Sequence, residues 1–400
     1  MKRTPSHNPG QMPLSFGPKN VRTTYPAGTQ KILMGSGDWM LLSFVLTITL
    51  IGLVMVYSAS SLIGEKTYHD SFYFVKRQFQ WLLLGMGAFW LTARINIQKL
   101  RKGIVLMTVL IFVLLLSVLI FGAEINGARR WFKIGSIAMQ PSELAKLFTV
   151  IYLAHYIDKK GAQIQDFIEG AVPPLIVVGL LAMLILLEPD FGTTVVILAV
   201  TLLLLFLGGA PFKQLCGVAA VTLPFFIYWV VSSPYRLERI MSFLNPWASA
   251  TSSGYQVIQS QVALGSGGLT GTGLAGVKQV LFFLPEPHTD FIFSVFGEAF
   301  GLIGTVLMVM LFMGILWRGT RIALKTTAPY DRTIAIGMTL LVVLPALLNM
   351  GVATGLLPTK GLPLPFMSYG GSSLISNSMA IGFLYNVSRQ VGQRPGRRTP

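Results

Sequence analysis

The sequence predicts an all-α polytopic membrane protein of about ten transmembrane helices, with a large extracytoplasmic loop between helices seven and eight. Two observations predict this fold class. Of the 400 residues, 53% are hydrophobic and only 12% are charged, whereas soluble proteins carry roughly a quarter charged residues. The apolar residues also lie in long unbroken blocks, and a helix needs about 20 of them to cross the hydrocarbon core of a bilayer.

The charged residues are arranged as a membrane protein requires. A formal net charge of +16 is compatible with a nucleic-acid-binding protein. The Lys and Arg residues lie, however, in short clusters between the apolar blocks and form no basic stripe, which argues against that class. Cys216 is the only cysteine, so the chain has neither an internal disulfide nor a cysteine-based metal site.

Ten apolar blocks are candidate spans. Their boundaries follow from hydropathy alone. The link 208–211, Gly-Gly-Ala-Pro, is short enough for a tight hairpin between two helices. The predicted spans are 39–62, 79–94, 103–122, 142–157, 172–188, 193–208, 212–233, 291–316, 333–355 and 370–388.

The two ends of the chain are polar and basic. Residues 1–35 contain no apolar stretch of the kind found in a signal peptide, and we expect a disordered cytoplasmic tail there. Residues 36–388 form one predicted membrane domain, and 389–400 form a second basic tail. When the N-terminus is placed inside, the inner segments hold about twice as many Lys and Arg as the outer ones. Both termini are therefore predicted to be cytoplasmic.

Residues 234–290 form a long link on the predicted outer side. Loops of this length are usually functional or disordered. This one is rich in glycine but also carries Trp247 and Phe282, which favours order. We expect a periplasmic loop that is partly helical and lies at the membrane interface.

Asp290 stands where this loop meets the eighth predicted helix. An Asp at this position can cap the helix N-terminus. It can also act as a general base, because a carboxylate beside an apolar boundary is suited to take a proton. The two interpretations are compatible. His288, two residues away, is more typical of a hydrogen-bonded partner than of a catalyst.

Three other acidic residues lie on or near the outer side. Glu188 and Asp190 occupy a Pro- and Gly-containing turn between helices five and six, where they are either solvated or part of a shared cavity. Glu143 and Lys146 lie inside the fourth predicted helix at a spacing of three residues, so they share a face and can pair. Ionisable residues within a span usually face the bundle interior or a wet cavity, although a structural ion pair is the alternative.

Two further segments have unusual composition. Arg130, which precedes the fourth helix, presents a planar fork of donors suited to phosphate, although an Arg beside Trp131 is also typical of a membrane boundary. Residues 354–373 contain prolines, glycines and hydroxyl groups, and include Lys360 and Ser368. Irregular backbone near membrane depth is tolerated where it is buried in protein or lines a wet cavity.

The position of these groups restricts the chemistry. The outer side of the membrane has no nucleotide supply, and no phosphate-binding glycine pattern follows a strand in this sequence. An enzyme acting there must use a substrate that arrives already activated, and a lipid carrier is the natural way to deliver it.

Taken together, these segments resemble the SEDS family, whose members include FtsW, RodA and SpoVE. The resemblance extends over about 40–388. It rests on Asn126-Gly127-Ala128 with Arg130-Trp131, Gln140-Pro141-Ser142-Glu143 with Lys146, Glu188-Pro189-Asp190 with Gly192-Thr193, Gly265 to Gly273, Pro285-Glu286 with His288-Thr289-Asp290-Phe291, and Gly355-Leu356-Leu357-Pro358 through Ser372.

The resemblance implies a peptidoglycan glycosyltransferase that polymerises lipid II into β-1,4 glycan strands with inversion at the anomeric centre. Asp290 matches the family's essential aspartate and would be the general base. Arg130, Lys360 or a divalent cation, Mg or Mn, would neutralise the pyrophosphate leaving group, and no organic cofactor is expected. The predicted substrate-binding residues are Arg130, Glu143, Lys146, Asp190, His288, Lys360 and Ser368.

Within the family, Pro358-Thr359-Lys360-Gly361 and the basic N-terminal tail are more similar to the FtsW branch than to RodA. This similarity implies septal cell-wall synthesis in cell division, at the inner membrane. The implied partners are a class B penicillin-binding transpeptidase (FtsI-like), the divisome regulators FtsQ, FtsL and FtsB, an FtsN-like protein, and undecaprenyl-pyrophosphate-linked glycan.

Three rival functions remain open from the sequence. A lipid II flippase would use the intramembrane Glu and Lys as its path. A non-catalytic scaffold would activate a transpeptidase without any chemistry of its own. Another lipid-dependent glycosyltransferase or ligase with a different acceptor is the third. The clustered outer acids and the Gly/Pro-rich segment argue against a pure scaffold, which needs neither.

Overall fold

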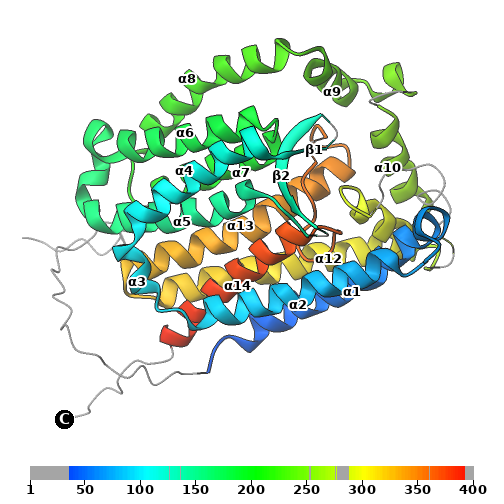
Figure 1. Ribbon diagram of the computed structural model, residues 1–400, viewed down its shortest axis with the longest axis horizontal. Coiled ribbons are helices and arrows are strands. Elements are labelled where there is room, and N and C mark those ends of the chain that lie inside the picture. The colour runs from blue at the N-terminus through cyan, green and yellow to red at the C-terminus, as the bar shows by residue number, and fades with distance from the viewer. Residues whose placement is uncertain are drawn as a thin grey trace, which may run out of the picture.

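The computed structural model describes residues 36–125, 127–135, 137–251, 254–274, 276, 288–359 and 361–391. Within these ranges the chain is a bundle of long helices that lie side by side, with a small sheet and shorter helices toward one end (Figure 1). The predicted N-terminal tail 1–35 lies outside the described residues. Of the predicted C-terminal tail, 389–391 continue the last helix and the rest lies outside.

A helix is found at each of the ten predicted spans. The apolar blocks therefore identified the long helices correctly, although several of them extend beyond the predicted bounds. These helices are α1 Trp39–Tyr68, α2 Tyr73–Arg94, α4 Ile104–Phe121, α5 Pro141–Lys160, α6 Val172–Leu187, α7 Phe191–Leu207, α8 Phe212–Val231, α12 Ile292–Lys325, α13 Pro329–Ala353 and α14 Gly371–Val391.

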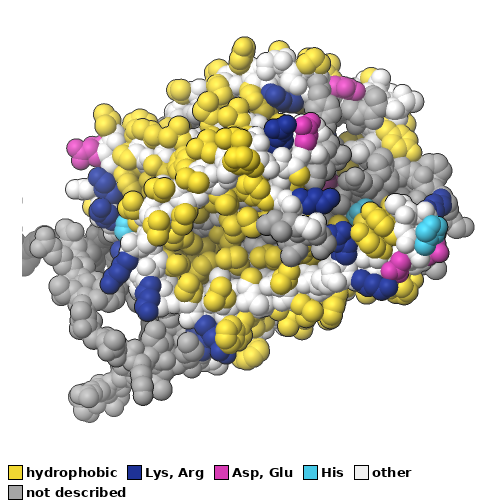
Figure 2. All heavy atoms as spheres, in the orientation of Figure 1, with side chains coloured by type: hydrophobic (Ala, Val, Ile, Leu, Met, Phe, Trp, Pro, Cys, Tyr) yellow, Lys and Arg dark blue, Asp and Glu magenta, His cyan; other side chains and the backbone are white. Residues whose placement is uncertain are grey.

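Six helical stretches among the described residues are long and apolar enough to cross a membrane: those of α1, α4, α6, α8, α12 and α13. Helix α7 is apolar but shorter. Helices α2, α5 and α14 are long enough but carry more charged and polar side chains. Figure 2 shows apolar side chains covering the face over α4 and α6, with Lys and Arg near both ends of the molecule. The chain is a multi-pass membrane protein, and the total of ten spans stays a prediction.

Among the described residues, helices α2 and α14 form the most extensive helix–helix contact in the bundle. A Cβ atom on Gly382 would lie 2.0 Å from the Thr92 hydroxyl oxygen, and one on Gly371 would lie 2.2 Å from the Trp81 ring. Asn386 of α14 also donates hydrogen bonds to the carbonyls of Thr92 and Ile95. Small residues and interhelical hydrogen bonds are the means by which membrane helices associate. The polar composition of α14 is therefore explained by its burial against α2.

A three-stranded antiparallel sheet lies between α4 and α5, where the sequence analysis predicted only a link. Its strands are β1 Ala123–Ile125, β2 Ala128–Ile134 and β3 Ile137–Met139, in the order β1-β2-β3. The register pairs Glu124 with Arg129 and Lys133 with Ala138. The sheet leads into α5 and presents β2 to the site described below.

The predicted outer loop contains helical segments, as expected: α9 Pro234–Leu244, the 3₁₀ turn Pro246–Ser249 and α10 Tyr255–Ser266. Helices α8 and α9 arch over the bundle (Figure 1). Residues 252–253, 275 and 277–287 lie outside the described residues. The interfacial position of this loop stays a prediction.

The turn that follows α10 is joined to a break in α12. Gly301 adopts φ 64°, ψ −163° within α12. Across this break, the amides of Leu302 and Ile303 donate to the carbonyls of Gly268 and Leu269. The amide of Thr272 donates in turn to the Glu298 carbonyl. Backbone groups freed inside a membrane protein must be satisfied by protein, and here the loop satisfies them.

Candidate functional site

One cavity of about 620 Å³ lies beneath the α8–α9 arch. It is bounded by β2, by the N-terminal ends of α5, α7 and α12, and by α9, α10 and the segment 358–373. Four of the eight predicted site residues line it. These are Arg130, Glu143, Asp190 and Asp290. The structure therefore brings together residues that are up to 160 positions apart in the sequence.

Asp290 lies in the turn that enters α12 and is partly exposed to the cavity. The N-cap of α12 is Phe291, so Asp290 lies one residue before the cap, and the helix-cap interpretation of Asp290 stays a prediction. The Asn349 side-chain amide donates to the Asp290 carbonyl and to the Leu362 carbonyl, both at 2.7 Å. This amide fixes the turn that carries Asp290 against the segment before α14.

His288 and Ser368 lie outside the lining of the cavity and support the turn from behind. The Ser368 hydroxyl donates to the Thr289 carbonyl at 2.6 Å, and the Tyr369 amide donates to the His288 carbonyl at 2.9 Å. The His288 ring packs against Phe74 and Tyr369, at centroid distances of 4.6 and 5.6 Å. Burial lowers the pKa of His288 to about 4, so its imidazole is neutral at pH 7.

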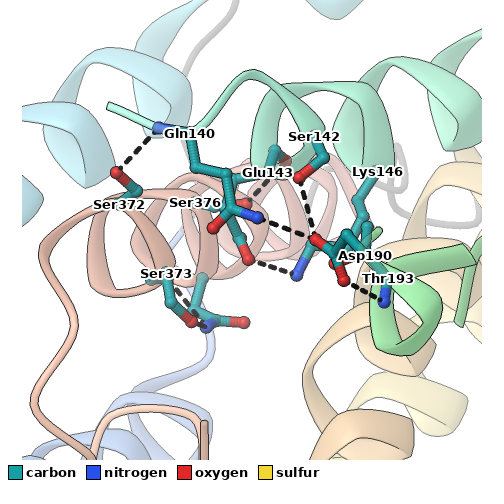
Figure 3. A network of polar contacts seen from close by, with 10 residues as sticks. Gln140, Ser142, Glu143, Lys146, Asp190, Thr193, Ser372, Ser373 and Ser376 are labelled. Atoms are coloured by element: carbon teal, nitrogen blue, oxygen red, sulfur yellow. Dashed lines mark hydrogen bonds and ion pairs between the residues drawn. The ribbon is translucent and has the colours of Figure 1, made fainter. Parts of the chain in front are cut away.

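Asp190 is the N-cap of α7. Its Oδ1 accepts a hydrogen bond from the Thr193 amide at 3.0 Å. Its Oδ2 accepts from the Gln140 side-chain amide at 2.7 Å and from the Ser142 hydroxyl at 3.3 Å. Figure 3 shows these groups converging on Asp190 from the start of α5. Asp190 thus joins α5 to α7 at the cavity wall.

Glu143 and Lys146 form the predicted ion pair, with Nζ 2.9 Å from Oε1 (Figure 3). Both side chains are nearly fully buried. Glu143 lines the cavity, whereas Lys146 lies behind it. The second carboxylate oxygen of Glu143, Oε2, has no hydrogen-bond partner among the described residues. The Ser376 hydroxyl donates to the Glu143 carbonyl at 3.1 Å, which joins α14 to this wall.

Arg130 reaches from β2 to the turn between α6 and α7. Its Nε donates to the Glu188 carbonyl and its Nη2 to the Pro189 carbonyl, both at 2.7 Å. A guanidinium group has five N–H donors, so three remain after these two bonds. Arg130 therefore positions the Glu188-Pro189-Asp190 turn and still has donors for an anion in the cavity.

The cavity also contains residues that the sequence analysis did not propose as site residues. Gln140, which was named there only for the family resemblance, lines it together with Trp229, Arg236 and Arg239. Two Arg residues three positions apart, shortly after an apolar span, were the available signal for a cationic helix at the site. Lys360, which was predicted to contact substrate, lies outside the described residues.

The carboxylates present allow few arrangements for a metal. Among the described residues, no group of three or more His, Cys, Asp or Glu side chains is placed to hold an ion. Mg²⁺ is commonly bound through one or two carboxylates together with substrate phosphates. The unpartnered Oε2 of Glu143 is an oxygen of that kind at the cavity wall. The predicted divalent cation is compatible with this side chain and stays a prediction.

The fold and the cavity define a multi-pass helical membrane protein with a polar pocket lined by carboxylates and arginines. The chain belongs to the FtsW/RodA/SpoVE family, described as cell cycle proteins, whose sequence profile matches residues 38–393. This confirms the family resemblance found in the sequence.

Relatives of known name span nearly the whole chain. A probable peptidoglycan glycosyltransferase FtsW of Geobacter metallireducens is 42% identical over 90% of this chain and 96% of its own. Stage V sporulation protein E of Bacillus subtilis is 41% identical over 88% of this chain and 97% of its own.

Solved structures show the same fold. A chain from a peptidoglycan synthase complex, described as coordinating polymerization and crosslinking, superposes with a TM-score of 0.75 at 30% identity, covering 90% of this chain and 99% of that one. The rod shape determining protein RodA of Thermus thermophilus gives 0.67 at 28% identity, covering 90% and 98%.

Proposed function

We propose that the protein is a peptidoglycan glycosyltransferase that polymerises lipid II into β-1,4 glycan strands. The observation that carries the proposal is the single cavity in which Asp290, a partly exposed carboxylate, faces the same space as Arg130 and Glu143. A base, a cation and a further carboxylate in one pocket are what glycosyl transfer from a diphosphate requires. The relatives named as glycosyltransferases support this function.

The proposed mechanism is a direct displacement. Asp290 takes the proton from the C4 hydroxyl of the acceptor sugar. The hydroxyl oxygen attacks the anomeric carbon of the donor from the face opposite the diphosphate, and a new carbon–oxygen bond forms. The bond to the diphosphate breaks and the leaving group keeps the electron pair. Inversion at the anomeric carbon follows from this single displacement.

The charge that develops on the leaving diphosphate needs stabilisation. Arg130 has three N–H donors that are not used within the described part of the chain. Lys360 is the second candidate. A divalent cation held by Glu143 would supply further positive charge. Glu143, Lys146 and Asp190 would otherwise shape the wall against which the sugar or the diphosphate lies.

The roles of His288 and Ser368 are indirect in this proposal. Both lie behind the turn that carries Asp290, and their hydrogen bonds involve the backbone of that turn. A rigid turn keeps the base within reach of the acceptor hydroxyl, and small displacements of a catalytic group reduce the rate strongly. They are therefore assigned to positioning Asp290 rather than to contacting substrate.

We also propose a class B penicillin-binding transpeptidase as partner, in accordance with the related complex that joins polymerization to crosslinking. The similarity to relatives called FtsW supports a place at the division septum. The same proposal includes three further points: the divisome regulators as partners, a cytoplasmic position of both termini, and a location in the inner membrane.

The test is glycan polymerisation on lipid II by the purified protein with its transpeptidase partner, in the presence of a divalent cation. Wild type should form polymer, and Asp290→Asn and Asp290→Ala should form none while still folding and binding the partner. Asp70→Asn removes another carboxylate on the predicted outer side, which pairs with exposed Lys76 and accepts from the Phe72 amide, and should polymerise normally. Polymer formation by the Asp290 variants would refute the base assignment.

The flippase alternative has one specific observation in its favour, the buried Glu143–Lys146 pair. It predicts that Asp290→Asn leaves lipid II transport nearly intact and that wild type forms no polymer. The same preparations, assayed for transport in vesicles, distinguish the two functions. The scaffold alternative predicts that wild type is inert in both assays but activates its partner.

A further inference from the structure

The outer ends of α1 and α2 carry four aromatic side chains in two stacked pairs. Tyr68, the last residue of α1, lies nearly parallel to Tyr73, with ring centroids 3.7 Å apart and an interplanar angle of 8°. Tyr57 and Phe72 form the second pair, at 4.9 Å. The exposed fractions of Tyr57, Tyr68 and Phe72 are 40%, 47% and 51%. These four residues form an aromatic platform that presents ring surface to the surroundings of the protein.

The aromatic platform is continuous with the wall of the cavity. Tyr369 lines the cavity, and its ring packs edge-on against the buried Phe74 at 5.4 Å. Phe74 packs edge-on in turn against Tyr73 at 5.3 Å and against Tyr68 at 5.9 Å. Ring contacts therefore lead without a break from the cavity to the platform. The connection between α1 and α2 lies at the same end of the bundle as α10, which bounds the cavity (Figure 1).

The rings of the platform are held in place. Arg77, one turn further along α2, donates from Nη1 to the Tyr73 hydroxyl oxygen at 2.9 Å. Its guanidinium carbon lies 5.7 Å from the centre of the Tyr73 ring. The Tyr73 ring is therefore fixed from one side by Arg77 and from the other by Tyr68. Rings that are already fixed lose little conformational freedom when they bind a ligand.

Exposed, fixed aromatic rings suit the flat face of a sugar. A pyranose ring whose substituents are equatorial presents C–H groups on its faces, and these are attracted to the negative face of an aromatic ring. The tyrosine hydroxyl groups can donate to and accept from the polar groups at the edge of the sugar. A β-1,4-linked glycan repeats this pattern along its length, so it fits a surface with several neighbouring rings.

Exposed tyrosines at helix ends also occur where a protein meets lipid headgroups. Anchoring of that kind requires neither ring-to-ring stacking nor a path of contacts to a cavity wall, and the platform has both. These two features favour a ligand that extends from the cavity onto the platform.

The size of the cavity creates a need for such a surface. A volume of about 620 Å³ is within the range of about 300–1,000 Å³ that holds one small-molecule ligand. A polymer exceeds it after a few sugars, so the older part of a growing strand must leave the cavity while its newest sugars stay near Asp290. A binding surface beside the exit would keep the strand attached between additions.

We propose that the aromatic platform is a glycan-binding surface that receives the growing strand as it leaves the cavity, with sugar rings lying on Tyr68 and Phe72. This inference rests on the proposed function and adds a product site to it. Binding of a finished glycan needs no polymerisation, so the inference and the proposed function can fail separately.

The probe is a short lipid-free glycan of alternating N-acetylglucosamine and N-acetylmuramic acid, freed of stem peptides. Isothermal titration calorimetry on the full chain in detergent should detect its binding to wild type. Tyr68→Leu with Phe72→Leu keeps the two side chains apolar but removes their ring faces, and should lower the affinity roughly 10-fold or more. In the polymerisation assay this double variant should release shorter strands, because a strand held only by the cavity dissociates sooner.

Phe79→Leu is the matched control. Phe79 is an exposed aromatic residue of the same helix, also at 51%, but it lies outside the platform, so glycan affinity and strand length should match wild type. Tyr68→Phe with Phe72→Tyr exchanges the two ring types and should keep most of the affinity, because both ring faces remain. Each single Leu variant should show part of the loss.

Unchanged glycan affinity or unchanged strand length in the Leu double variant would overturn the inference, as would the absence of binding to wild type. An equal loss in Phe79→Leu would assign the effect to aromatic anchoring in detergent and would overturn it too. Thermal unfolding shows whether each variant is folded, and the single Leu variants serve if the double variant is not. If wild type binds the glycan but forms no polymer from lipid II, the surface stands and the glycosyltransferase proposal fails instead.

Discussion

The carboxyl group of Glu188 is buried beside Arg130, yet Arg130 gives its hydrogen bonds to the backbone carbonyls of Glu188 and Pro189. Both of those bonds are 2.7 Å long. Within the part of the chain that the structure describes, neither oxygen of the Glu188 carboxyl group has a hydrogen-bond partner, and the residue is fully buried. Burial raises the pKa of Glu188 to about 8, nearby Asp190 adds to the rise, and Arg130 opposes it. Glu188 is therefore a neutral acid at pH 7.

This raised pKa predicts a stability that falls as the pH rises. The unfolded chain releases the Glu188 proton near the ordinary pKa of 4.5, whereas the folded chain keeps it up to about pH 8. The protonated Glu188 carboxyl group thereby contributes a few kcal/mol to the free energy of unfolding. This contribution is fully present below pH 4.5 and is lost progressively as the pH rises to about 8. Glu188→Gln, which is neutral and of the same shape, should be more stable than wild type at pH 8.

Thermal unfolding of detergent-solubilised protein between pH 5 and pH 9 checks this prediction. The stability of Glu188→Gln relative to wild type should grow with pH, and its polymerisation activity should be retained. Glu124→Gln alters an exposed carboxylate of the small sheet and should leave the pH dependence unchanged. Parallel curves for wild type and Glu188→Gln would contradict the prediction.

Gly271 should be essential to the junction between the outer loop and α12. Gly271 has φ +85°, and a Cβ atom added there would lie 2.1 Å from the Ala299 carbonyl oxygen. Gly271→Ala should therefore lower the free energy of unfolding by about 2 kcal/mol or more. Activity should fall as well. The loop around Gly271 is hydrogen-bonded to the first part of α12, so a shift of this loop also moves the start of α12 and Asp290.

The matched control for this change is Gly265→Ala. Gly265 lies in α10, and no atom lies within 4 Å of an added Cβ. Ala is also the better helix former, so this variant should be as stable as wild type or slightly more so. Comparable unfolding temperatures for the two Ala variants would show that the junction at Gly301 does not depend on close backbone contact.

The helices were predictable from sequence for a clear physical reason. Lipid allows only long apolar stretches to cross it, so the long helices leave a local hydropathy signal in the sequence, even α14, whose Ser and Asn residues are explained by burial against α2. The sheet 123–139 was missed because its strands are short and its Arg and Lys residues interrupt the alternation of apolar and polar side chains. The Glu143–Lys146 ion pair was predicted correctly from its spacing, whereas the roles of Asp290 as base and of Arg130 as a phosphate ligand stay predictions.

The sequence could not indicate which of these residues meet. Asp190 and Gln140 are brought together by the packing of α5 on α7, and Arg239 lines the same cavity as Asp290 because the α8–α9 arch returns over the bundle. Ser368 was expected at the substrate but supports the turn behind it, since its hydroxyl is used by the Thr289 carbonyl. Such convergence depends on long-range packing, for which a single sequence holds no local signal.

Glu143 and Lys146 should be energetically coupled, so that replacing one of them lowers the free energy of unfolding more than replacing both. Removing one partner leaves the other as an uncompensated buried charge, which costs about 3–5 kcal/mol, whereas replacing both by apolar or neutral residues is often close to neutral. Lys146→Met should therefore destabilise strongly, and adding Glu143→Gln should recover most of the loss.

Unfolding measured for the two single variants and the double variant gives the coupling energy directly. Additive losses would show that the pair is not coupled. Activity gives an independent reading, because Glu143 lines the cavity and Lys146 does not. The double variant should be stable but slow if Glu143 contacts substrate or a cation.

Asn349 should affect the rate of polymerisation through the position of Asp290. Its amide holds the Asp290 and Leu362 carbonyls, so Asn349→Leu leaves two carbonyls unpaired at a cost of about 2–4 kcal/mol. Asn386→Leu removes an equivalent pair of bonds, to Thr92 and Ile95, and should destabilise to a similar extent. Because Thr92 and Ile95 are not among the residues that line the cavity, only Asn349→Leu should also lower kcat, by roughly 10-fold or more, with little change in KM. Equal kcat values in the two variants, measured on lipid II under conditions where both are folded, would show that Asn349 contributes to stability alone.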